Sequence, residues 1–150
     1  MIRSFIMGAV TATFVVGGVA MAKQYTDYMP QRGIWEITAV EVDPNHVDDY
    51  LTGLRKSQMP GFEVMKRRGI MDSYRFLVRN GYSKGSPNVL IETHLTSASM
   101  LDPDQARDQA VEKEILATFS EAQGKVAVAG YEKYRQFVDD GLWSEVTMVK

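Results

Sequence analysis

Four short segments of the chain show strand-like patterning, and two longer segments follow a helical period. The strand segments are rich in β-branched and aromatic residues or alternate apolar with polar positions. They run over Ile34 to Val42, Ile70 to Arg79, Val89 to Leu95 and Leu142 to Val149. The helical segments follow the first and the third of these strands.

Both predicted helices open on an Asp-Pro pair, in which aspartate caps the helix and proline fits its first turn. The first helix starts at Asp43-Pro44 and is interrupted at Pro60-Gly61, so we expect a kinked or two-part helix. The second starts at Asp102-Pro103 and weakens around residues 124–130, and a further short helix is expected before the last strand. Apolar residues form one stripe on each helix: Val47, Tyr50, Leu51 and Leu54 on the first, and Val111, Ile115 and Phe119 on the second.

The order of these elements is strand, helix, strand, strand, helix, strand. Residues 80–88 are dense in turn formers, so the two middle strands are expected to form an antiparallel hairpin. The order predicts the ferredoxin-like βαββαβ plan of the α+β class, a four-stranded antiparallel sheet with both helices on one face. The other face of such a sheet needs a cover of its own.

This layout resembles the dimeric α/β-barrel superfamily, in which two ferredoxin-like protomers press their open sheet faces together. The resemblance covers residues 34–150 and is carried by IWEITAVEV with Asp43-Pro44, the hairpin from Ile70 to Leu95, and the closing WSEVTMV. It implies a homodimer. Members include cofactor-free monooxygenases, haem-degrading enzymes and lactone isomerases, so the fold does not select one chemistry. No catalytic motif of these groups occurs in the sequence, and none of their functional residues is carried over.

Residues 1–22 are predicted to be a secretory signal peptide. They contain Arg3, an apolar run over residues 5–19 and the cleavage pattern Ala20-Met21-Ala22. The run is shorter than the roughly 20 apolar residues that cross a bilayer. We therefore expect a periplasmic or secreted protein with no stable membrane insertion after cleavage. An extended lead-in at residues 23–33 and one domain at residues 34–150 make up the rest.

The charge and composition exclude several classes of function. The chain has 17 Lys and Arg against 19 Asp and Glu, and loss of Arg3 with the signal would change its net charge from −2 to −3. This mild acidity argues against a nucleic-acid partner. The absence of cysteine excludes thiolate chemistry, and the two histidines, His46 and His94, lack metal-ligand spacing, so no metal site is expected. The sequence predicts no cofactor, and haem binding by one of the two histidines is kept as an alternative.

Polar residues at alternate strand positions define the candidate site. Glu92 and His94 lie two residues apart in one strand and must share a face, and a carboxylate with an imidazole suits proton transfer. Arg75 is the third candidate catalytic residue, because a guanidinium stabilises an anionic oxygen. If the more apolar side of each strand meets the helices, the same face carries five candidate ligand-binding residues: Glu36, Thr38, Arg79, Trp143 and Glu145.

Three functions follow from this pattern. The sequence favours a binding protein for a small aromatic or carbonyl compound held inside the barrel. The second candidate is a cofactor-free or haem-dependent enzyme of the monooxygenase or isomerase kind. The third is a structural dimer without a ligand, in which the polar residues only form cross-strand ion pairs.

Overall fold

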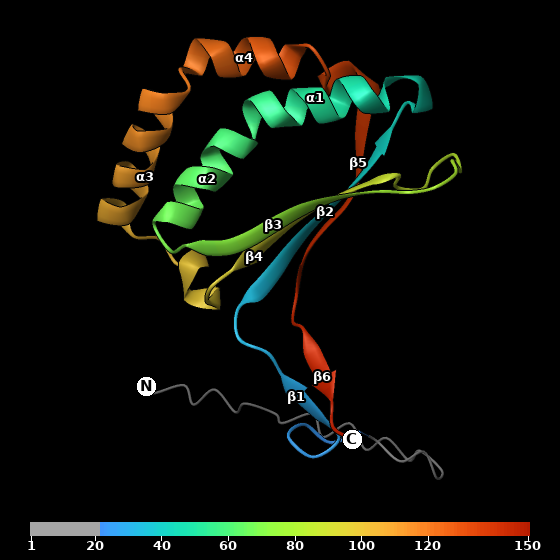
Figure 1. Ribbon diagram of the computed structural model, residues 1–150, viewed down its shortest axis with the longest axis vertical. Helices are drawn as coiled ribbons and strands as arrows, with labels where there is room; N and C mark the ends of the chain where they lie inside the picture. The colour runs from blue at the N-terminus through green and yellow to red at the C-terminus, as the bar shows by residue number, and fades with distance from the viewer. Residues whose placement is uncertain (1–21) are drawn as a thin grey trace, which may run out of the picture.

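The computed structural model describes residues 22–150, so nearly all of the predicted signal peptide lies outside the described residues. Four strands form one antiparallel sheet in the order β3–β4–β2–β5 (Figure 1). Their bounds are β2 Ile34–Val42, β3 Met71–Val78, β4 Val89–Leu95 and β5 Arg135–Trp143. The first and third of these strands are central, which is the ferredoxin-like arrangement, and the predicted fold class is confirmed.

The first helical segment folds as predicted. It consists of the 3₁₀ helix η1 Pro44–His46 and the helices α1 Val47–Ser57 and α2 Met59–Arg67. The Asp43 side chain accepts a hydrogen bond from the Asn45 amide. The predicted break occurs, but at Gln58, and Pro60 and Gly61 lie in the first turn of α2. Gly69 ends the segment with a φ of +69°, and its amide donates to the Lys66 carbonyl.

The second helical segment differs from the prediction. The short helix η2 Ala98–Leu101 comes first, and Asp104, not Asp102, caps α3 Gln105–Thr118. Helix α4 Glu121–Ala129 and the short η3 Glu132–Tyr134 follow, and β5 begins where a further helix was expected. Helix α3 lies against α2 and α4 against α1, as an outer layer (Figure 1). None of the helices in residues 22–150 is long and apolar enough to cross a membrane.

The core lies between α1 and the sheet. Its largest cluster of buried residues joins Val40, Val42, Tyr50, Leu54, Val89 and Tyr131. The Tyr131 ring packs directly on Gly53 of α1, since a Cβ there would lie 2.0 Å from a ring carbon. The predicted stripe on α1 therefore faces the sheet, and Tyr131 connects the outer layer to the core.

The prediction of one continuous last strand from Leu142 to Val149 is wrong. Strand β5 ends at Trp143, and a separate strand, β6 Val146–Met148, pairs with β1 Tyr28–Pro30, which lies in the predicted lead-in. These two strands form an arm that protrudes beyond the end of the four-stranded sheet (Figure 1). We call residues 23–30 and 146–150 the arm.

Candidate functional site

Strand register decides which candidate residues share a face of the sheet. Residue Glu92 is opposite Arg75 on one side and Ile37 on the other, while Trp35 is opposite both His94 and Trp143. Residues directly opposite each other in antiparallel strands share a face. The face away from the helices, the open face, therefore carries Arg75, Glu92, His94 and Trp143, as the sequence predicted.

Ion pairs and stacking engage the polar groups of the open face. The Arg75 Nε donates to a carboxylate oxygen of Glu92, which is only 4% exposed. The Arg75 guanidinium lies 4.8 Å from the ring centroid of Trp35, and the Trp35 indole N–H donates to Glu145 at 3.1 Å. These residues, with Ile37, Trp143 and Ser144, line a hollow of about 290 Å³.

The His94 imidazole pairs with Asp72 and not with Glu92. Its Nδ1 lies 2.7 Å from Asp72 Oδ1, and this hydrogen bond is the main reason that the pKa of Asp72 falls below its ordinary value. The other ring nitrogen, Nε2, lies against Gly33, where a Cβ would be 2.5 Å from it. Asp72 thus engages Nδ1 while Nε2 lies close to Gly33, and a role for His94 in proton transfer stays a prediction.

The predicted face of Glu36 and Thr38 is wrong. These residues, with Val40, lie on the helix side, and Trp35 and Ile37 lie on the open face instead. Strand β2 is apolar on both sides, so its alternation did not identify the buried face. Arg79 directly follows β3 and is exposed, beyond the open-face cluster around Glu92.

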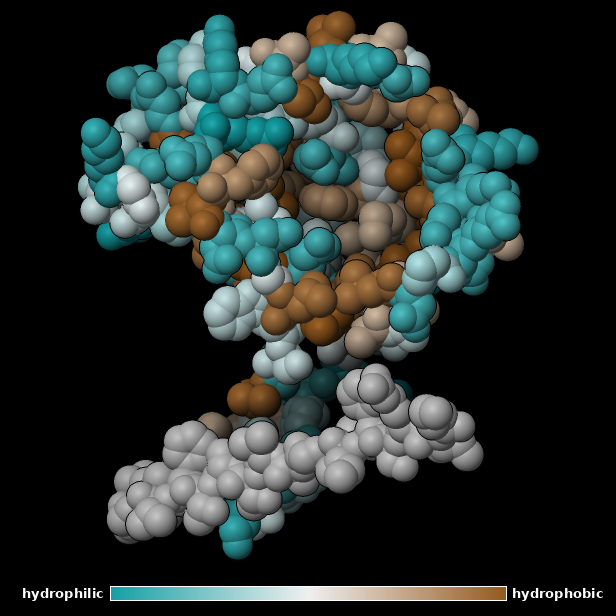
Figure 2. Space-filling view, turned by 180° about the vertical axis from the view of Figure 1, so that it is seen from behind, coloured by the Kyte–Doolittle hydropathy of each residue, from teal (hydrophilic) through white to brown (hydrophobic). Residues whose placement is uncertain are grey.

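A second cavity lies between the helices and the sheet. We call this space of about 210 Å³ the helix–sheet cavity. Figure 2 shows that the molecule is hollowed between its helical layer and its strands. Strand residues form the floor and residues of α1 and α2 the roof; the lining is Glu36, Thr38, Leu54, Gln58, Phe62, Ile91, Thr93, Arg135 and Phe137.

Charged and hydroxyl groups enter this cavity among apolar walls. Thr93 donates to Glu36 at 3.3 Å, and Thr38 donates to Asp140 at 2.9 Å. The Arg135 guanidinium lies 4.5 Å from the Phe137 ring centroid, and within residues 22–150 it has no carboxylate partner. A cation that lines a partly enclosed space and has no ion-pair contact is suited to an anionic ligand group.

The Tyr50 hydroxyl is a further unsatisfied polar group near the cavity. Tyr50 is fully buried, and its hydroxyl has no hydrogen-bond partner in the described part of the chain. Burial raises the pKa of Tyr50, and the nearby Arg135 cation opposes this rise. Arg135 therefore interacts with the Tyr50 hydroxyl and also lines the cavity.

Sequence reasoning missed Gln58 and Arg135 as cavity residues. Arg135 was placed in a helical segment that is a strand in the structure, and Gln58 lies at the break between α1 and α2. A usable signal was present in β2 and β4, where Glu36, Thr38 and Thr93 interrupt the apolar side of each strand. Polar residues at such positions are typical of a cavity and not of a packed core.

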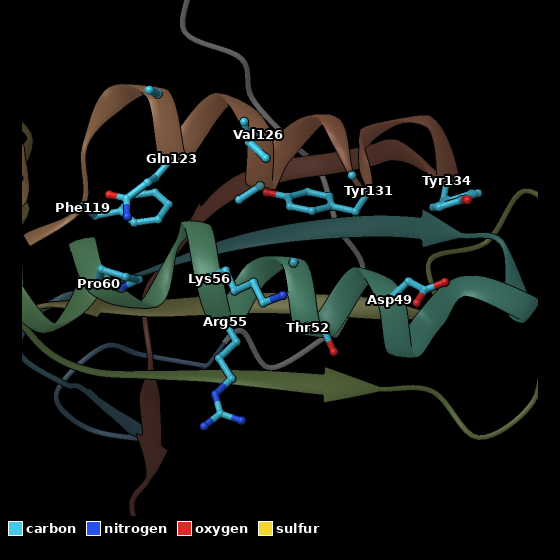
Figure 3. Close-up of a pocket in the computed structure, with 14 residues that line it drawn as sticks. Asp49, Thr52, Arg55, Lys56, Pro60, Phe119, Gln123, Val126, Tyr131 and Tyr134 are labelled. Carbon is cyan, nitrogen blue, oxygen red and sulfur yellow. The ribbon is translucent and has the colours of Figure 1, made fainter.

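A larger hollow than the helix–sheet cavity is a groove between α1 and α4. Its volume is about 910 Å³, and Tyr131, whose hydroxyl lies 2.8 Å from Ser57 Oγ, forms part of its floor. Figure 3 shows that Arg55 points away from α4, and Val126 on its rim is 75% exposed. The groove is lined by polar as well as apolar side chains, among them Asp49, Lys56 and Gln123, and it is wider and more open than the helix–sheet cavity.

The fold and the cavity define an α+β protein of ferredoxin-like topology with a mixed polar and apolar space under its helices. No protein-family model matches the sequence, and no curated protein matches it. Among solved structures, the chain is similar to a dimeric ferredoxin-like protein from an uncultured marine organism. That match has 11% identity and a TM-score of 0.41, and it covers 81% of this chain and 96% of the other. It is also similar to a NipSnap family protein of unknown function from Agrobacterium tumefaciens, at 12% identity, a TM-score of 0.38, and 79% and 88% coverage.

Proposed function

We propose that this protein binds a small, one-ring aromatic or carbonyl compound with an acidic group, and that the ligand lies in the helix–sheet cavity. The observation that carries the proposal is the composition of this cavity. An Arg135 guanidinium without a carboxylate partner and the Glu36 carboxylate line the same space as Leu54, Phe62 and Ile91. Ligand sites typically combine apolar walls with a few polar groups that fix orientation.

Each part of such a ligand has a matching group in the cavity. An anionic oxygen would accept charge-assisted hydrogen bonds from Arg135, and a ring would pack among Leu54, Phe62 and Phe137. A ligand hydroxyl would donate to Glu36. The volume of about 210 Å³ lies below the roughly 300–1,000 Å³ typical of drug-sized ligands, which limits the ligand to about one ring.

Haem does not fit the helix–sheet cavity. His46 stacks on Tyr134 with ring centroids 3.6 Å apart, and its Nδ1 lies 2.8 Å from Asp49. The Nδ1 of His94 pairs with Asp72 and its Nε2 lies close to Gly33, and the helix–sheet cavity is far smaller than a macrocycle requires. We therefore derive no step through haem, and binding is the function that the geometry supports best.

Export is part of the proposal and rests on the sequence of residues 1–22. The proposed place of action is the periplasm or the exterior. N-terminal sequencing of the protein isolated from its native cells tests this directly, with a start near Lys23 expected. Recovery of a chain that still begins at Met1 or Ile2 would contradict export by a cleaved signal.

Calorimetric titration with three related compounds tests the binding site. The probes are 4-hydroxybenzoate, benzoate and phenol, which separate the contributions of the carboxylate and the hydroxyl. We expect 4-hydroxybenzoate to bind most tightly. Replacing Arg135 with Gln should weaken its binding about 10- to 100-fold, the equivalent of one charge-assisted hydrogen bond, and leave the weaker binding of phenol unchanged.

Arg75→Gln on the open face is the matched control, since it also removes one guanidinium that stacks on an aromatic ring. This variant should retain the affinity for 4-hydroxybenzoate. A loss of affinity in Arg75→Gln with none in Arg135→Gln would place the ligand on the open face and overturn the proposal. Absence of binding by all three compounds would overturn the proposed ligand class.

A further inference from the structure

The arm ends in exposed apolar and aromatic side chains. Tyr28 lies opposite Met148 at the end of the β1–β6 ladder farther from the sheet, and Tyr25 lies beyond that ladder. Tyr25 is 69% exposed, Met148 66% and Val149 48%. We call these three residues the tip of the arm, which lies at the end of the molecule opposite the helices (Figure 1). Exposed apolar residues gathered in one place are typical of an interaction site.

Main-chain hydrogen bonds hold the tip in one shape. The Tyr25 amide donates to the Tyr28 carbonyl at 2.7 Å, and the Asp27 amide donates to the Lys23 carbonyl at 2.7 Å. From the other strand, the Val149 amide donates to the Asp27 carbonyl at 2.9 Å. Tyr25 has a φ of +65°, which is uncommon for a residue with a side chain. The turn therefore presents Tyr25 from a fixed backbone, which lowers the entropic cost of a contact.

The arm is basic, although the domain that carries it is acidic. Lys23 and Lys150 lie next to the tip in sequence, and neither forms an ion pair within residues 22–150. The one acidic side chain of the arm, Asp27, accepts a hydrogen bond from the Lys23 amide at 2.5 Å. The chain from Lys23 onward has a formal net charge of −3, since Arg3 is the only charged residue before it. An anionic surface therefore attracts the arm and repels the rest of the domain.

The tip is also close in sequence to the predicted signal peptide. The apolar run over residues 5–19 ends four residues before Lys23, which is about 14 Å of extended chain. The predicted signal thus places the tip beside a bilayer during export. Val126 on α4 is even more exposed than Tyr25, but α3 and α4 carry four carboxylates against three cations, two of which are already in ion pairs. Position and charge therefore favour the arm as the part that meets a membrane.

We propose that the tip of the arm binds reversibly to the surface of an anionic phospholipid bilayer. In this arrangement the Tyr25 ring lies among the lipid headgroups, where an aromatic ring with a polar end is favoured. Met148 and Val149 contact the boundary of the acyl chains, and Lys23 and Lys150 lie near lipid phosphates. The contact is peripheral and combines a small apolar group with a basic one. It does not depend on a ligand in the helix–sheet cavity.

Vesicle flotation of a chain of residues 23–150 tests the proposal, since this chain contains every strand and helix of the structure and lacks the apolar run. Vesicles of equal parts phosphatidylcholine and phosphatidylglycerol should bind it about tenfold more tightly than vesicles of phosphatidylcholine alone. Lys23→Gln with Lys150→Gln should abolish this difference. Lys113→Gln, on α3 and also without an ion pair in residues 22–150, is the matched control and should retain it.

The apolar part of the contact has its own pair of variants. Tyr25→Ser with Met148→Ser should lower binding to the mixed vesicles by about tenfold or more, because less apolar surface leaves water. Val126→Ser removes a more exposed apolar side chain from α4 and should bind like the natural chain. Circular dichroism and the unfolding midpoint verify that all variants fold.

Tryptophan emission reports which part of the molecule meets the lipid. Tyr25→Trp and Val126→Trp add one indole each to the same background of Trp35 and Trp143. The mixed vesicles should shift the emission of Tyr25→Trp to the blue and leave that of Val126→Trp in place. A chain that stays unbound with both kinds of vesicle, as expected if a second copy covers the arm, would overturn the proposal. A blue shift confined to Val126→Trp would show that the outer helices, and not the tip, meet the membrane.

Discussion

Gly33 occupies the most crowded point of the open face. Its φ of +81° is a backbone angle that residues other than glycine rarely adopt. A Cβ added at Gly33 would lie 2.5 Å from the His94 ring and from the Leu95 carbonyl oxygen. The backbone must pass this close for β2 to begin beside His94. Gly81 has a similar φ of +94° with nothing within 4 Å of an added Cβ.

These two glycines provide a matched pair of variants. Gly81→Ala should lower the free energy of unfolding by about 1–2 kcal/mol, the cost of the left-handed backbone alone. Gly33→Ala should cost about 1–3 kcal/mol more, because it adds overpacking against backbone and imidazole. Urea unfolding measures both. Equal losses would show that the His94 ring moves freely and that the open-face cluster is not tightly packed.

The buried hydroxyls of Tyr50 and Tyr131 differ in one respect. The two rings pack edge to face with centroids 5.2 Å apart, but only the Tyr131 hydroxyl has a partner, Ser57. Tyr131→Phe should therefore lower the unfolding free energy by about 1 kcal/mol. Tyr50→Phe should lower it less, because the Tyr50 hydroxyl has no hydrogen bond of ordinary geometry and only the nearby Arg135 guanidinium interacts with it. A loss in Tyr50→Phe as large as in Tyr131→Phe would reveal a partner for that hydroxyl.

Alternation along a strand predicted part of the open-face cluster and could not predict the rest. The shared face of Glu92 and His94 follows from their spacing alone. Asp72, the actual partner of His94, lies at an irregularity of the β3–β4 register between Met71 and Ser73. Such a bulge leaves no trace in the alternation of side chains. The sequence pattern therefore could not predict Asp72 as the partner of His94.

At the scale of elements, ion pairs connect α3 to α2. Arg67 and Arg68 at the end of α2 each lie 2.8 Å from an oxygen of Glu114 on α3. Helix α3 has no fully buried residue, and Val111 contributes partly buried apolar contacts to the second core cluster, so the ion pairs add to limited apolar packing. The Arg67 hydrogen bond, followed by that of Arg68, lowers the pKa of Glu114.

Glu114→Gln should therefore loosen α3 without unfolding the sheet. A carboxylate with a lowered pKa in the folded state stabilises that state at pH values above the ordinary glutamate range. This contribution is lost as the pH falls through the lowered pKa. We expect amide hydrogen exchange in α3 to accelerate in the variant and, for the natural chain, in acid. Glu112→Gln, on the same helix but without an ion pair in residues 22–150, is the control and should exchange like the natural chain.

Local sequence signals were sufficient to predict the elements of the first helical segment, but they were not sufficient to predict those of the last part of the chain. Asp43, Pro60 and Gly69 act through their own backbone, so sequence alone places the breaks. Tyr131, Tyr134 and Val138 have helical spacing, yet β5 begins at Arg135 because it pairs with β2. An irregularity of this register between Ala39 and Val40 also breaks the alternation. Tertiary pairing here overrides local preference.

At the scale of the molecule, the placement of α3 and α4 explains the cavity. The sequence predicted both helical segments on one face of the sheet, but α3 and α4 lie mainly on α2 and α1. The helix side of β5 consequently stays open, with Phe137 56% exposed and Leu142 53% exposed. The space left over β2 and β5 is the helix–sheet cavity. Binary patterning predicted helices on one face of the sheet, but it could not predict the outer layer formed by α3 and α4 or this gap.

The most direct test of the account is an NMR titration of the isotope-labelled protein with 4-hydroxybenzoate. The chain has two tryptophans, and both Trp35 and Trp143 lie on the open face, so their indole N–H signals report on that face alone. We predict that the amide signals of Thr38 and Thr93 shift on binding, while both indole signals stay in place. Shifts of the indole signals without shifts of Thr38 and Thr93 would contradict binding in the helix–sheet cavity.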